Sequence, residues 1–105
     1  MLAELEHKPD ALIALCRRFG VERLELFGSA ARAGEFDPAR SDIDLLVTLS
    51  PDVQDDLAAF VDLHAALEAF FGRRVDLLER AAIEASRNPI RRRRILSEAQ
   101  PLYAA

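Results

Sequence analysis

The chain has 105 residues, of which 50% are hydrophobic and 30% charged, and its formal net charge is −4 at pH 7. These values suggest a single domain spanning residues 1–105, with enough apolar residues for a core. They argue against a protein that holds long nucleic acid through its overall field, which needs clustered Lys and Arg. No apolar run approaches the ~18 residues of a membrane helix, and the N-terminus lacks the apolar segment of a signal peptide. The single cysteine excludes an internal disulfide, so a reducing, cytoplasmic setting fits.

The first predicted elements are a helix and a strand. The helix covers residues 9–18 and ends at Gly20, because glycine readily adopts the left-handed conformation that closes a helix. Its apolar face consists of Leu12, Cys16 and Phe19. Residues 21–27 follow as a strand, in which Leu24 and Leu26 alternate with charged residues.

The middle of the chain predicts a short helix, a loop, a strand and a long helix. The short helix starts at Gly28-Ser29, residues 34–40 are an exposed loop, and residues 43–49 are the clearest strand. Ser50-Pro51 then has the residue types of a helix start, and the long helix runs to about Phe71, before Gly72. The predicted apolar stripe of this helix is Val53, Leu57, Phe60, His64, Leu67 and Phe71. We interpret His64 as a half-buried, hydrogen-bonded histidine rather than a metal ligand.

Three further elements complete the predicted fold. Residues 74–79 form a third strand, residues 81–87 are helical, and a last helix begins at Asn88-Pro89 and ends near Pro101. The order is helix, strand, short helix, strand, helix, strand, helix. This order predicts an α/β (α+β) domain in which a short mixed sheet packs against helices.

Two aspartates in the second strand carry the strongest chemical signal. Side chains alternate along a strand, so Asp42 and Asp44 point to one face, while Ile43, Leu45 and Val47 point toward a core. At a separation of ~5 Å and an effective dielectric of ~20, the two carboxylates repel each other by roughly 3 kcal/mol. A divalent cation would reverse that repulsion, and carboxylates suit Mg²⁺.

The third strand offers another carboxylate, Asp76, between Val75 and Leu77, which should face the core. If this strand is the neighbour of the second, Asp76 lies on the same open face as Asp42 and Asp44. Three aspartates could then hold two metal ions ~3.5–4 Å apart, an arrangement that serves phosphoryl or nucleotidyl transfer.

Gly28 and Ser29 lie where the first strand ends and the short helix begins. Glycine permits close backbone approach, and the free N–H groups of a helix N-terminus attract anions. The Ser29 hydroxyl can add a hydrogen bond to a phosphate oxygen, and Arg32 could supply positive charge to the same phosphates. The segment is therefore a candidate phosphate-binding loop.

These residues together resemble a known signature. Gly28-Ser29, followed after a gap by Ser41-Asp42-Ile43-Asp44, looks like the motif of the DNA polymerase β-like nucleotidyltransferase superfamily. The segments FGSAAR and SDIDLLV are similar to those of minimal nucleotidyltransferases (MNT), which are small prokaryotic proteins. The resemblance covers nearly the whole chain, Asp76 included. One departure is that many relatives carry Arg-Gly soon after Gly-Ser, whereas here Arg32 is followed by Ala33.

The resemblance implies the polymerase β-like nucleotidyltransferase fold and an activity. Asp42 and Asp44 would bind Mg²⁺, Asp76 would be the third carboxylate and help deprotonate the acceptor, and Gly28 with Ser29 would hold the triphosphate. A hydroxyl would attack the α-phosphate of ATP or another nucleoside triphosphate and release pyrophosphate. Family members often act as antitoxins beside a HEPN-type toxin, and some transfer AMP to a tyrosine of that toxin.

Other interpretations stay open at this point. The aspartates could line a solvated strand edge, Gly28-Ser29 could be only a tight turn, and Arg32 could be a surface charge. The protein as a whole could neutralise a partner by binding without catalysis, or could adenylylate a small molecule if it had a substrate-binding domain. The run Arg91–Arg94 is expected to be a solvated, partner-facing surface. Exposed apolar positions on the first or last helix could support an oligomer.

Overall fold

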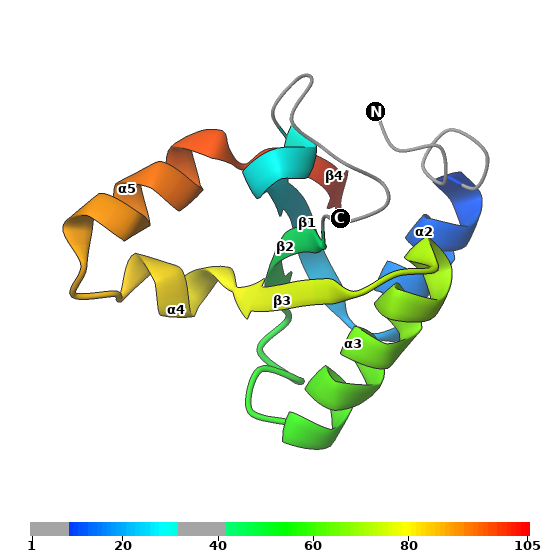
Figure 1. Ribbon diagram of the computed structural model, residues 1–105. Helices are drawn as coiled ribbons and strands as arrows, with labels where there is room; N and C mark the ends of the chain where they lie inside the picture. Colours follow the sequence, from blue (N-terminus) through cyan, green and yellow to red (C-terminus); the bar gives the residue numbers. More distant parts are fainter. Residues whose placement is uncertain (1–8, 32–41) are drawn as a thin grey trace.

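The computed structural model describes residues 9–31 and 42–105 (Figure 1). A mixed sheet lies between two groups of helices, which confirms the predicted α/β (α+β) class. No helix in these two ranges is long and apolar enough to cross a membrane. The elements in chain order are α2 (Pro9–Arg18), β1 (Val21–Phe27), the 3₁₀ helix η1 (Gly28–Ala31), β2 (Ile43–Leu49), α3 (Leu57–Phe71), β3 (Val75–Glu79), α4 (Arg80–Glu84), α5 (Pro89–Glu98) and β4 (Gln100–Ala104).

Within the described ranges, the sheet has four strands in the order β3-β2-β1-β4. Strand β1 is antiparallel to both β2 and β4, whereas β2 and β3 run parallel. Parallel neighbours need a crossover connection, and helix α3 supplies it between β2 and β3. The same direction and register of β2 and β3 bring residues from the start of both strands together.

Apolar side chains cover both faces of the sheet. On the first face, the inward side chains of β1 and β2 pack against α2 and α3, as the predicted alternation requires. On the second face, a smaller cluster lies under α4 and α5 and consists of Phe27, Leu46, Ile83 and Ile95.

Helix ends follow the predicted cap residues in three places. Gly20 and Gly72 have left-handed φ angles of 70° and 67°, and Asn88 accepts a hydrogen bond from the Arg91 backbone N–H. Cys16 on α2 is fully buried, as predicted, and burial raises the pKa of its thiol from 9.0 to about 11. The two glycines and the asparagine therefore mark three helix ends correctly.

The predicted start of the long helix at Ser50-Pro51 is wrong. Residues 51–55 form turns instead, in which the Val53 N–H donates to the Ser50 carbonyl at 3.0 Å. Helix α3 starts six residues later because the Asp56 carboxylate accepts from the Ala59 N–H at 3.0 Å. Leu57 therefore stands at the helix start with 75% of its surface exposed, outside the apolar stripe.

The C-terminal part also differs from the prediction. Helix α4 ends at Glu84, and α5 ends at Glu98 rather than near Pro101. The last residues form β4, which pairs with β1 and was not predicted. Proline is tolerated there because β4 is an edge strand of the sheet, where a missing N–H costs no ladder hydrogen bond.

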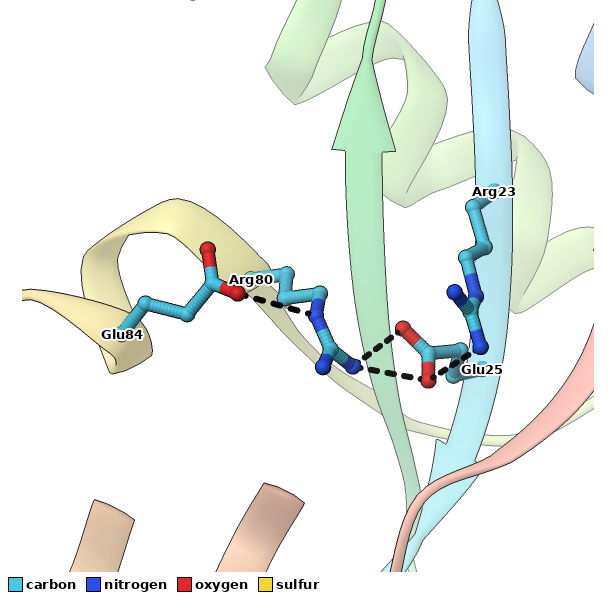
Figure 2. Close-up of polar contacts among 4 residues, drawn as sticks. All are labelled: Arg23, Glu25, Arg80 and Glu84. Carbon is cyan, nitrogen blue, oxygen red and sulfur yellow. Dashed lines mark hydrogen bonds and ion pairs between the residues drawn. The ribbon is translucent and has the colours of Figure 1, made fainter.

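Glu25 is buried, although the alternation of β1 predicted exposed charges between Leu24 and Leu26. It is only 1% exposed, because α4 and α5 cover the second face of the sheet. Figure 2 shows that Arg80, the first residue of α4, reaches across β2 and donates from Nη1 to both carboxylate oxygens of Glu25 at 2.8 Å. Arg23 lies 3.5 Å from the same carboxylate. This charged pair ties α4 to the centre of the sheet.

Candidate active site

The structure places Asp44 and Asp76 side by side. Strands β2 and β3 are parallel neighbours, and Asp44 is the direct register partner of Asp76. The condition on which the three-aspartate prediction depended, that these strands are adjacent, is therefore confirmed. Asp42 precedes β2 by one residue and shares the face of Asp44 by alternation. Asp42 and Asp76 are exposed and Asp44 is partly buried, so this edge of the site faces solvent.

Gly28 lies against the Asp44 carboxylate. It follows Phe27, the register partner of Asp44 in β1, and has a left-handed φ of 72°. A Cβ at this position would collide with Asp44 Oδ2 and lie 3.1 Å from Asp44 Cγ. The backbone conformation therefore favours glycine here, and any side chain at this position would displace the Asp44 carboxylate.

A short helix does begin at Gly28, as predicted, and its four residues, Gly28–Ala31, form a 3₁₀ turn. Such a short turn has a small dipole, so its N-terminus contributes little to the binding of an anion. Ser29 is partly buried next to Gly28. The Gln100 side chain, at the start of β4, donates to the Ala31 carbonyl at 3.1 Å and anchors the turn. Arg32 lies outside the described residues.

The donor chemistry of the aspartates fits Mg²⁺. This ion is commonly bound by one or two carboxylates, with water and substrate phosphates completing its shell. Asp44 and Asp76 supply two such carboxylates from adjacent strands. Within residues 9–31 and 42–105, no three His, Cys, Asp or Glu side chains are gathered closely enough to hold a metal ion. Asp44 and Asp76 are thus register partners, but the described residues form no three-ligand cage.

Arg74 belongs to the same neighbourhood and was missed by the sequence analysis. Its carbonyl accepts from the Ile43 N–H at 3.1 Å, which extends the parallel ladder beyond the start of β3. Continuing the register by one residue places Arg74 beside Asp42, and alternation puts it on the face of Asp76. The spacing of two residues between Arg74 and Asp76 was the signal that could have found it.

The arginine run on α5 lies on the surface. Arg91, Arg93 and Arg94 are exposed, and Arg94 pairs with Glu98 at 3.7 Å. Arg92 is partly buried and donates to the Ser86 carbonyl at 2.7 Å, which closes the turn before the helix. The run therefore combines a solvated surface with one local structural contact.

Comparison with known proteins points to a single family. The nucleotidyltransferase domain family matches residues 10–102 of the chain. A minimal nucleotidyltransferase of known structure is 34% identical, with a TM-score of 0.72, over 95% of this chain and 94% of that chain. A search of curated proteins finds no match.

Toxin–antitoxin complexes share the fold. A chain of a toxin–antitoxin structure with AMP-PNP is 20% identical, with a TM-score of 0.65, over 93% of this chain and 74% of that chain. A chain in the complex of tri-AMPylated Shewanella oneidensis HEPN toxin with MNT antitoxin is 18% identical, with a TM-score of 0.56, over 91% and 69%. At these identities the likeness concerns the fold alone. The match over residues 10–102 and the structure that is 34% identical show that the chain belongs to the nucleotidyltransferase domain family and has the fold of the minimal nucleotidyltransferases.

Proposed function

We propose that the chain is a Mg²⁺-dependent nucleotidyltransferase that transfers a nucleoside monophosphate, AMP from ATP, to a hydroxyl group. One observation carries the proposal. Asp44 and Asp76 are register partners on adjacent parallel strands, and the backbone of Gly28 packs against the Asp44 carboxylate. Two carboxylates beside a glycine turn suit a metal-bound triphosphate, because the turn lets phosphates approach the backbone closely.

Each residue of the site has a role in this proposal. Asp42, Asp44 and Asp76 would hold Mg²⁺, as one or two ions completed by water and phosphate oxygens, and Gly28 with Ser29 and Arg32 would bind the triphosphate. When bound, the metal ions neutralise phosphate charge at the reacting centre. As the oxygen of the acceptor hydroxyl forms a bond to the α-phosphorus, Asp76 accepts the proton of that hydroxyl. The bond from the α-phosphorus to the bridging oxygen breaks, and pyrophosphate leaves.

The proposed acceptor is a tyrosine of a partner protein, a HEPN-type toxin, so that the chain acts as an antitoxin. Two facts support a protein acceptor. Asp42 and Asp76 are exposed, so a bulky acceptor can reach this edge of the sheet. The fold is also shared with chains of toxin–antitoxin complexes, one of which contains an AMPylated HEPN toxin.

Intact-mass spectrometry tests the proposal. The product of the neighbouring gene is incubated with this chain, ATP and Mg²⁺, and compared with reactions containing the Asp44→Asn variant. Asp62→Asn is the matched control, because Asp62 is an exposed residue on α3, outside the site. We expect a gain of one or more AMP units with the unmutated chain and with Asp62→Asn, and none with Asp44→Asn. A stable complex without any mass gain would instead support a binding-only antitoxin.

A further inference from the structure

The start of β3 is held from two sides. Among the described residues, β3 is an edge strand of the sheet and pairs with β2 alone. Because the Arg74 carbonyl faces β2, the N–H and carbonyl of the next residue, Val75, point away from β2. Without partners outside the sheet, these two groups would lack hydrogen bonds at a sheet edge.

Side chains of α3 pair both groups of Val75. Glu68 Oε2 accepts a hydrogen bond from the Val75 N–H at 2.9 Å, and His64 Nε2 lies 2.7 Å from the Val75 carbonyl oxygen. A carbonyl oxygen only accepts, so Nε2 carries the proton and donates. The contacts confirm that His64 is a hydrogen-bonded histidine, and they form what we call the Val75 clasp, made by His64, Glu68 and Val75.

The two clasp side chains of α3 lie on a helix that packs against the core. His64 and Glu68 are one helical turn apart, with Nε2 and Oε2 separated by 3.5 Å. The neighbouring face of the same helix segment is anchored in the core by Leu63 and Leu67, which are 1% and 0% exposed. The helix turn that carries His64 and Glu68 is therefore packed against the sheet.

The clasp acts on the backbone that carries Asp76. A peptide unit is planar, so the Val75 carbonyl and the Asp76 N–H move together. Glu68 fixes the peptide plane before Val75, and His64 fixes the plane between Val75 and Asp76. Holding the second of these planes fixes the peptide group on the N-terminal side of Asp76, the register partner of Asp44.

We propose that His64 and Glu68 are positioning residues that set Asp76 against Asp44 for nucleotide transfer. The inference rests on the proposed function of the site. Groups that orient the ligands of a metal site through hydrogen bonds typically change activity by about 10–100-fold when removed. A clasp that only covers a sheet edge would affect stability but not turnover in the folded protein.

The test compares leucine and glutamine variants of each clasp residue. His64→Leu and Glu68→Leu remove the hydrogen bond, whereas His64→Gln keeps an N–H donor and Glu68→Gln keeps an oxygen acceptor. Both side chains are more than a third exposed, so the fold should tolerate these changes. Asp62→Leu, on an exposed face of α3, is the matched control. The readouts are kcat, KM for ATP, thermal unfolding, and amide hydrogen exchange of residues 75–77.

We expect the leucine variants to lose about 10–100-fold in kcat with KM for ATP changed less than about threefold. The glutamine variants should recover most of that loss, and amide exchange should accelerate at residues 75–77 only in the leucine variants. Unchanged kcat in folded leucine variants, or glutamine variants as impaired as leucine variants, would overturn the inference. If even the unmutated chain transfers no nucleotide, the proposed function fails by itself. Exchange at residues 75–77 then decides whether the clasp holds β3, and unchanged exchange refutes it.

Discussion

Replacing Gly28 by alanine should damage the site far more than the fold. The substitution has two effects: a side chain in a left-handed conformation, at φ 72°, and a Cβ that collides with the Asp44 carboxylate. Gly72 separates the two effects, because its φ is 67° but, among the described residues, nothing lies within 4 Å of an added Cβ. Gly72→Ala therefore carries the conformational cost alone.

The expected magnitudes follow from these contacts. The left-handed conformation costs alanine about 1–2 kcal/mol at either position. At Gly28, the colliding atom belongs to the end of a side chain, so the Asp44 carboxylate can turn away for about another 0.5–1.5 kcal/mol. That movement lowers the free energy of unfolding only slightly, but a displacement of ~1 Å at a reacting centre can reduce the rate by about 10²-fold.

Urea unfolding and calorimetric titration with Mg²⁺·ATP measure the two quantities separately. We expect both variants to fold, with Gly28→Ala less stable than Gly72→Ala by about 1 kcal/mol. Only Gly28→Ala should lose nucleotide binding and transfer. Normal binding and transfer in Gly28→Ala would show that the position of the Asp44 carboxylate does not matter, and would refute the proposed site.

Three further changes test the packing around the site. Arg80→Met leaves the Glu25 carboxylate buried with only Arg23 nearby, so urea unfolding should show a loss of about 3 kcal/mol, mostly recovered in Glu25→Leu/Arg80→Met. Because burial raises the pKa of Cys16 from 9.0 to about 11, a thiol reagent at pH 8 should modify it only after unfolding, and stability should fall as the pH rises from 9 toward 11, since the unfolded thiol ionises first. Asp56→Ala removes the cap of α3 and should cost about 1 kcal/mol in thermal unfolding.

Local chemistry predicted most of the fold. Glycine at helix ends, asparagine before proline, and the alternation of β2 each act within a few residues, so the sequence alone reveals them. The start of α3 was misplaced because Ser50-Pro51 and Asp56 both have cap chemistry, and only the observed turns decide between them. Strand β4 was missed because its pairing with β1 is a long-range contact that no local pattern encodes.

The site also combines features set by local sequence patterns with contacts between distant segments. The spacing of Asp42 and Asp44 predicted a shared face, and the alternation around Asp76 predicted the third carboxylate, which the parallel register of β2 and β3 places beside Asp44. Contacts between distant segments could not be predicted. The burial of Glu25 depends on α4 crossing the sheet, and the Val75 clasp depends on where α3 lies against the edge of β3.

Asp44 and Asp76 should act together at one nucleotide-transfer site. A double-mutant cycle tests it most directly, with rates of Mg²⁺-dependent AMP transfer measured for Asp44→Asn, Asp76→Asn and the double variant. If both carboxylates serve one site, each single variant should lose at least about 10²-fold, and the double variant should lose little more than either. Losses that multiply in the double variant, or a single variant with an unchanged rate, would show that the two carboxylates do not act together at one site.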